Sequence, residues 1–273
     1  MLARVLFGAV GFVFVLLALF VFPPAVLEIA LALLCALATY ELLGSTKLVK
    51  NHGIVLLSVV VSLLCGLNQA GFMLKSPLHG WIGLALVIVL LLGSFAELLR
   101  HHDRVGASEV LCAFFGALIL PQLLLSLTRI FQMENGALLV LMPLLAAWGS
   151  DTFALFAGML FGKHKLAPVI SPKKTVEGGI GGVFGGVACL LVFTLLVNHF
   201  AGLSLSYAAA GLLGAAGSVI GQVGDLSFSI IKRQTGIKDY GSIFPGHGGV
   251  LDRFDSVIFV APVVEAVLLL FGA

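Results

Sequence analysis

The chain has 273 residues, of which 60% are apolar and 10% are charged. Soluble domains are nearer to about 45–50% apolar and about 25% charged, so this composition excludes a soluble globular enzyme, a disordered chain and a nucleic-acid-binding domain. The net charge of +2 is too small to identify a partner, and none of the four cysteines belongs to a Cys-x-x-Cys pair that would indicate a metal site.

Nine apolar runs are long enough to form membrane-spanning helices, because about 20 apolar residues cross a bilayer. In chain order they lie at about 5–22, 25–43, 54–74, 80–99, 109–127, 136–161, 176–199, 203–231 and 256–272. The first two are separated by Phe22-Pro23-Pro24, a break that a single helix does not accommodate. The sequence therefore predicts an all-α polytopic membrane protein with about nine transmembrane helices.

The basic residues of the loops orient these helices. If all nine runs span the membrane and the N-terminus is cytoplasmic, 13 of the 15 lysines and arginines fall in cytoplasmic segments, and Lys75 and Arg129 fall outside. Cytoplasmic loops of membrane proteins carry such an excess of positive charge. We therefore predict a cytoplasmic N-terminus and an external C-terminus.

The two most basic loops, at about 162–175 and 232–255, flank the seventh and eighth runs. We therefore predict two parts: residues 1–135, with helices 1–5 as a scaffold, and residues 136–273, with helices 6–9 and the catalytic loops. The seventh and eighth runs are rich in glycine, in places at four-residue spacing. Such spacing lets helix backbones pack closely in lipid, and it also allows a homodimer.

Five acidic residues lie within or near the predicted spans, where a charge at the helix centre costs about 2.5–3.5 kcal/mol. They are Glu28, Glu97, Asp151, Asp225 and Glu265. The first two are near helix ends and are expected to be structural, and Glu265 has no evident partner. Asp151 and Asp225 lie roughly 18 Å and 10 Å from the basic ends of their helices, which indicates a polar cavity open to the cytoplasm.

Asp225 and Asp252 are predicted to face each other across the turn that joins the last two helices. Two facing carboxylates repel each other unless a cation lies between them, and oxygen ligands at a water-accessible site suit Mg²⁺. We therefore predict that both bind Mg²⁺. Asp255, three residues further on, is interpreted as a cap of the last helix.

Basic and hydroxyl side chains surround this predicted metal site. Besides the two metal ligands, Lys232, Arg233 and Asp151 are candidate catalytic residues. The candidate substrate-binding residues are Ser171, Lys173, Lys174, Thr175, Lys238, His247 and Arg253. Pro172 is expected to begin a helix whose N-terminal N–H groups attract phosphate. Acids combined with basic loops are typical of metal-assisted phosphoryl or nucleotidyl transfer.

Several of these residues belong to longer strings at fixed spacing. The strings are Asp151-Thr152, Phe161-Gly162-Lys163, Ser171-Pro172-Lys173-Lys174-Thr175-Val176-Glu177-Gly178, Ser229-Ile230-Ile231-Lys232-Arg233, Lys238-Asp239 and Phe244-Pro245-Gly246-His247-Gly248-Gly249-Val250-Leu251-Asp252-Arg253-Phe254-Asp255. Together they resemble the motifs of phosphatidate cytidylyltransferase, the bacterial integral membrane CDP-diacylglycerol synthase. The resemblance is strong over about 148–256 and weak over the first five apolar runs.

The resemblance implies a nucleotidyltransferase of phospholipid biosynthesis. Its substrates would be CTP and phosphatidic acid, its products CDP-diacylglycerol and pyrophosphate, and Mg²⁺ would be required. It also implies a multi-pass protein of the bacterial cytoplasmic (inner) membrane with its active site facing the cytoplasm, and a monovalent cation such as K⁺ sharing the acidic site.

Two other functions use similar residues. A phosphosugar transferase acting on polyprenyl phosphate also needs many helices, acids and Mg²⁺, but it would take a UDP-sugar in place of CTP. An ion-coupled transporter would use Asp151 and Asp225 to couple ion movement, although the internal repeats that transporters often have are not found between the two halves.

Overall fold

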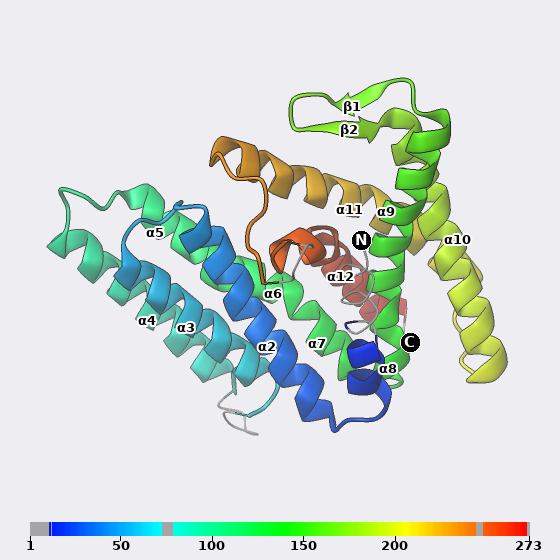
Figure 1. Cartoon of the computed structure of the whole chain (residues 1–273). Coiled ribbons are helices and arrows are strands. Elements are labelled where there is room, and N and C mark those ends of the chain that lie inside the picture. The colour runs from blue at the N-terminus through cyan, green and yellow to red at the C-terminus, as the bar shows by residue number, and fades with distance from the viewer. Residues whose placement is uncertain (1–10, 12, 73–78, 244–247, 272–273) are drawn as a thin grey trace. The chain divides into compact units, whose positions relative to one another are not determined.

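A computed structural model describes residues 11, 13–72, 79–243 and 248–271. Within these ranges the chain is almost entirely helical (Figure 1). It forms two compact units, each of which is discontinuous in sequence. The first contains residues 1–128 and 234–253, and the second contains residues 129–233 and 254–273. The segment 234–253 thus packs with the N-terminal helices, whereas the scaffold and catalytic roles predicted for residues 1–135 and 136–273 stay predictions.

The first unit consists of helices with two π-helical segments. In chain order these are α2 (Pro24–Tyr40), η1 (Glu41–Ser45), α3 (His52–Gln69), α4 (His79–Arg100), α5 (Ala107–Phe114), η2 (Phe115–Ile119), α6 (Leu120–Leu124) and the start of α7 (Ser126–Phe131). Close approaches between helices occur at glycines: a Cβ at Gly66 would stand 2.6 Å from the Ala32 backbone of α2. Leu90 and Ala117 are fully buried in an apolar core between α3, α4 and η2.

The second unit contains the end of α7 and the helices of the part predicted to be catalytic. Only the first residues of the last of these helices, up to Arg253, belong to the first unit. The elements of the second unit are α8 (Gly136–Leu139), α9 (Leu141–Phe161), the strands β1 (Lys165–Ala167) and β2 (Ser171–Thr175), α10 (Val176–Phe200), α11 (Tyr207–Gln234) and α12 (Leu251–Phe271). The helices α9 and α10 lie side by side, and β1 and β2 form an antiparallel hairpin at their ends (Figure 1).

Seven segments within the described ranges are long and apolar enough to cross a membrane. They are Pro24–Ser45, His52–Gln69, Gly80–Arg100, Ala107–Phe131, Gly136–Phe161, Val176–Phe200 and Tyr207–Gln234. They coincide with the second to eighth predicted runs, which confirms an all-α multi-pass membrane protein. The first run lies partly outside the described residues, and the ninth falls on α12 up to Phe271. A total of nine helices and the orientation of the termini stay predictions.

The glycines of the seventh and eighth predicted runs allow the second unit to pack tightly. A Cβ at Gly182 would stand 2.9 Å from Ser150 Oγ of α9, and one at Gly214 would stand 2.6 Å from the Val187 backbone of α10. Both glycines are buried. Close helix packing is therefore the structural role of these two positions.

The helix expected at Pro172 begins later in the chain. Residues Ser171–Thr175 form β2, and α10 begins at Val176. The start is fixed by Thr175, whose hydroxyl oxygen accepts a hydrogen bond from Gly178 N at 3.1 Å and so caps the helix. Pro172 is tolerated because a two-stranded hairpin has only edge strands.

Glu265, which had no evident partner in sequence, forms a bidentate ion pair inside the second unit. Arg129 Nε and Nη2 donate to its two carboxylate oxygens at 2.6 Å and 2.9 Å. Both side chains are largely shielded, with exposed fractions of 27% for Arg129 and 12% for Glu265. The pair therefore joins α7 to α12 by charge-assisted hydrogen bonds.

Replacing Glu265 with methionine is expected to lower the free energy of unfolding by about 1.5–3 kcal/mol, because two hydrogen bonds between charged groups are lost. Thermal unfolding of the detergent-purified protein measures this change. The double variant Arg129→Met/Glu265→Met is expected to unfold at a higher temperature than Glu265→Met, since it leaves no unpaired charge. Equal unfolding temperatures for Glu265→Met and wild type would show that the pair does not stabilise the fold.

Candidate active site

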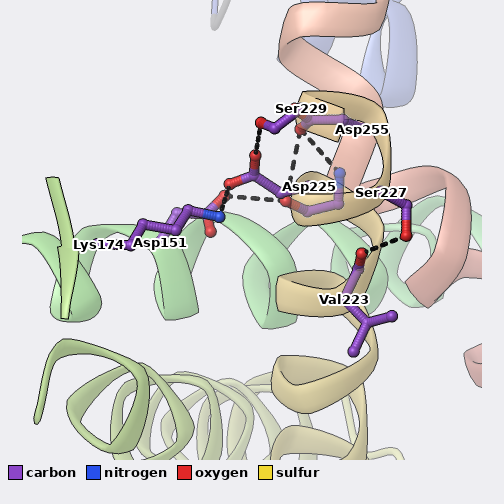
Figure 2. A network of polar contacts seen from close by, with 8 residues as sticks. Asp151, Lys174, Val223, Asp225, Ser227, Ser229 and Asp255 are labelled. Carbon is purple, nitrogen blue, oxygen red and sulfur yellow. Dashed lines mark hydrogen bonds and ion pairs between the residues drawn. The ribbon is translucent and has the colours of Figure 1, made fainter. Parts of the chain in front are cut away.

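Asp225, in the C-terminal half of α11, is the centre of a polar cluster in the second unit. Lys174 Nζ of β2 donates to Asp225 Oδ2 at 2.5 Å, and Ser229 Oγ, one helical turn further along α11, donates to Asp225 Oδ1 at 3.2 Å (Figure 2). The exposed fractions of the Lys174 and Asp225 side chains are 27% and 22%. The two charged groups are thus partly shielded while keeping access to solvent.

Two further carboxylates, Asp151 of α9 and Asp255 of α12, lie close to Asp225 (Figure 2). Ser256 connects them: its Oγ donates to Asp151 Oδ2 at 3.2 Å, and its backbone N donates to Asp255 Oδ1 at 2.8 Å. Asp255 also interacts electrostatically with Asp225, with Asp151 and with Lys232. The three carboxylates and two lysines, when all are ionised, carry an excess of one negative charge.

The close contact between α11 and α12 that brings Asp225 and Asp255 together requires a glycine. A Cβ at Gly224 would stand 2.6 Å from Phe259 Cδ2 and 2.8 Å from the backbone oxygen of Asp255. Any larger side chain at this position would separate the two helices. The sequence Gly224-Asp225 therefore combines the contact point and the central carboxylate of the cluster in consecutive residues.

The hairpin that carries Lys174 is held at its base and near its tip. Glu177 of α10 accepts hydrogen bonds from Lys163 N at 3.1 Å and from His164 N at 3.2 Å. Arg233 Nε, near the end of α11, donates to the Ile170 backbone oxygen at 3.2 Å. These contacts fix the hairpin to the helices of its own unit, so that Lys174 is placed at Asp225.

The remaining candidate residues of the second unit lie on β2 and near the end of α11. Lys173 and Arg233 are exposed, Ser171 and Lys232 are half-buried, and Thr175 is buried. The Thr175 hydroxyl acts as the cap of α10. Lys232 therefore contributes charge to the acidic cluster and Arg233 contacts the hairpin, whereas the hydrogen bond of Thr175 is that of a helix cap.

Asp252, Lys238 and Arg253 lie in the first unit. Asp252 Oδ2 accepts hydrogen bonds from Tyr240 N at 2.8 Å and from Gly249 N at 2.9 Å. Lys238 and Arg253 are exposed, and His247 lies outside the described residues. The predicted pairing of Asp225 with Asp252 stays a prediction.

Two contributors to the cluster were not identified from sequence. Asp255 was interpreted as a helix cap, which is wrong because α12 begins at Leu251, four residues earlier. Its position four residues before Phe259, which packs on Gly224, places it on the face toward α11. Ser256 is nearly fully buried, and nothing in its local sequence distinguished it from other helical serines.

The donor set can be compared with what Mg²⁺ requires. Within the described ranges, no three Asp, Glu, His or Cys residues are arranged to enclose a metal ion. Mg²⁺ needs no such cage, because proteins usually hold it through one or two carboxylates and leave other positions to water and phosphate. Asp225, with Asp151 or Asp255, provides carboxylates of this kind, and the excess negative charge favours a cation. These residues therefore fit Mg²⁺ bound together with a phosphate-containing substrate.

Ser229→Ala is expected to lower kcat/KM of the reaction at this site about tenfold, the effect of losing one hydrogen bond to a charged group. The matched control is Ser227→Ala, because the Ser227 hydroxyl donates to Val223 O at 2.7 Å and lies away from Asp225 (Figure 2). Steady-state kinetics of both variants check this. Equal activities for the two variants would remove Ser229 from the site.

Comparison with known proteins identifies a family and its named members. The model of the cytidylyltransferase family matches residues 2–271. A phosphatidate cytidylyltransferase of Staphylococcus epidermidis is 32% identical over 255 residues, which cover 93% of this chain and 96% of the relative. Proteins of the same name are 45% identical over 138 residues in Staphylococcus aureus and 44% identical over 136 residues in Staphylococcus haemolyticus, in each case about half of both chains.

Proposed function

The chain belongs to the cytidylyltransferase family, and from this premise we infer that it converts CTP and phosphatidic acid into CDP-diacylglycerol and pyrophosphate. Relatives named for this activity include one aligned over almost the whole chain. The reaction places the protein in phospholipid biosynthesis as a membrane-bound nucleotidyltransferase. The observation that supports this function best is the Lys174–Asp225 pair beside two further carboxylates, since nucleotidyl transfer needs both cations for phosphates and acids for a metal ion.

The chemical step is an in-line displacement at phosphorus. A phosphate oxygen of phosphatidic acid forms a bond to the α-phosphorus of CTP, and the bond from that phosphorus to the bridging oxygen breaks. The electron pair of that bond leaves with pyrophosphate. Because the attacking oxygen is already an anion, positioning and charge neutralisation contribute most of the catalysis.

The cationic side chains of the second unit supply this neutralisation. Lys174 exchanges part of its interaction with Asp225 for a substrate phosphate, while Lys173, Lys232 and Arg233 hold the other phosphate oxygens. Mg²⁺, when bound, neutralises developing charge on the pyrophosphate and aligns the two substrates. Asp225, together with Asp151 or Asp255, would hold that ion, and Asp252 is a further ligand in our proposal.

The proposed location is the bacterial inner membrane, with the active site facing the cytoplasm. Of the 15 basic residues, 13 fall in segments predicted to be cytoplasmic, and CTP is a cytoplasmic solute. A monovalent cation such as K⁺ is proposed at the same acidic cluster, and a homodimer is proposed from the glycine-rich helices. The polyprenyl phosphate and transporter alternatives receive no support from the family.

The position of the label in CTP tests this function. Detergent-purified protein is incubated with phosphatidic acid, Mg²⁺ and CTP labelled with ³²P at either the α or the γ phosphorus. We expect the α label to enter the lipid and the γ label to appear in pyrophosphate, with neither transfer in excess EDTA. Gamma label in lipid would indicate phosphoryl transfer instead, and UDP-sugar-dependent labelling of polyprenyl phosphate would establish the alternative enzyme.

A further inference from the structure

A buried glutamate in the N-terminal part of the chain binds the backbone at the start of α12. Glu41 is 1% exposed. Its Oε1 accepts a hydrogen bond from Val250 N at 2.9 Å, and its Oε2 accepts one from Leu251 N at 2.8 Å. More than 200 residues separate the partners in sequence. A carboxylate at a helix N-terminus satisfies N–H groups that have no partner within the helix and interacts favourably with the helix dipole.

The backbone of the neighbouring segment closely surrounds the Glu41 carboxylate. Cβ atoms added at Gly241 or Gly249 would collide with the carboxylate oxygens of Glu41. Both glycines belong to the segment 234–253 that packs into the first unit. The segment therefore encloses the carboxylate closely, and a side chain of different shape or charge would displace it.

The helix that carries Glu41 is itself braced against its neighbours. Thr39 Oγ1 donates to Gly116 O of η2 at 2.8 Å and also interacts with Ser62 Oγ of α3 at 2.9 Å. Glu41 is the first residue of the π-helical segment η1, and π-helical turns within α-helices occur frequently at functional sites. The carboxylate is thus presented from a fixed position.

We propose that Glu41 is a positioning residue that fixes the N-terminus of α12, and through it Asp252 and Arg253, in the geometry required for cytidylyl transfer. Those residues occupy the first two turns of the helix that Glu41 caps. The Glu41-bound peptides directly follow Gly249, whose N–H donates to Asp252. This inference rests on the proposed function, because it assigns these residues of α12 to that reaction.

Glu109 provides a matched control in the same unit. It is 8% exposed, and its Oε2 accepts hydrogen bonds from Lys50 N at 2.8 Å and Asn51 N at 3.1 Å, at the start of α3. Like Glu41, Glu109 is therefore a buried carboxylate that accepts hydrogen bonds from two consecutive backbone N–H groups at the start of a helix. The helix that it supports carries none of the candidate catalytic residues.

The experiment compares Glu41→Gln with Glu109→Gln in the full-length, detergent-purified protein. In each variant an amide replaces a carboxylate that accepts two N–H groups. For Glu41→Gln we expect kcat to fall by about 10–100-fold, as for other residues that orient metal ligands, and the Mg²⁺ concentration for half-maximal rate to rise. For Glu109→Gln we expect a comparable fall in thermal stability, with kcat and the Mg²⁺ requirement near the wild-type values.

Two results would overturn the inference: loss of activity in proportion to loss of stability in both variants, or an unchanged Mg²⁺ requirement in Glu41→Gln. If Glu41→Gln does not fold, the pair Glu41→Asp and Glu109→Asp gives the same comparison, because the shorter side chain keeps the charge and loses the contact. Absence of CTP-dependent lipid labelling by the wild-type protein would instead refute the proposed function. The two failures are thus distinguishable.

Discussion

Asp225→Asn is expected to lower the rate of CDP-diacylglycerol formation by at least about 1,000-fold, the upper range for removing one preorganised electrostatic group from an active site. The substitution keeps the shape of the side chain but removes the charge that binds Lys174 at 2.5 Å and that we assign to Mg²⁺. Initial rates of transfer of α-labelled CTP into lipid, measured at saturating substrates, check the expected loss.

Ser227→Ala serves as the control for this variant, since it alters α11 two residues further along and leaves the Asp225 contacts in place. Size-exclusion chromatography and thermal unfolding establish that both variants are folded. If folded Asp225→Asn kept more than a tenth of the wild-type rate, Asp225 would not be a metal ligand of this reaction.

Lys174→Met is expected to lower kcat/KM for CTP by about 100-fold. Methionine retains the apolar length of the lysine but supplies no positive charge for a phosphate. It also leaves Asp225 without its nearest cation, so that the three carboxylates of the cluster repel one another more strongly. Kinetics over a range of CTP concentrations measure this effect.

Lys165→Met is the matched control for Lys174→Met, because Lys165 is an exposed lysine on the other strand of the same hairpin. Its register partner in the hairpin is Thr175, and the lysine in the ion pair with Asp225 is Lys174. We expect the kcat/KM of Lys165→Met to stay near the wild-type value. Similar losses of kcat/KM in the Lys174→Met and Lys165→Met variants would mean that the total positive charge of the hairpin matters. The Lys174–Asp225 contact would then have no specific role.

Much of the fold could be predicted from sequence because hydropathy is a local property. Seven predicted runs coincide with helices that are able to span a membrane. The hairpin at residues 165–175 was not predicted: its three lysines and two prolines are typical of a loop, and its strands are held by Glu177 and Arg233 through tertiary contacts. Nor was the assignment of 234–253 to the first unit predicted, because it depends on Glu41, far away in the chain.

Some residues of the candidate site could likewise be identified from local sequence, whereas others depend on contacts with distant parts of the chain. Asp225 and Asp151 could be identified as candidates because carboxylates are costly within membrane helices. Asp255 was misinterpreted because the position of the α12 start, set in part by Glu41 and Leu251, decides whether that residue is a cap or an inward-facing carboxylate. The sequence contains the relevant residues, but their pairing depends on where helices begin.

Metal binding measured with Mn²⁺ in place of Mg²⁺ tests the central claim most directly, namely that the cluster around Asp225 holds a divalent cation together with CTP. Electron paramagnetic resonance distinguishes free from bound Mn²⁺ in samples of the detergent-purified protein with CTP and without it. We predict CTP-dependent binding of Mn²⁺ by wild type and Ser227→Ala, and loss of that binding in folded Asp225→Asn. Equal binding by Asp225→Asn and wild type would contradict the account.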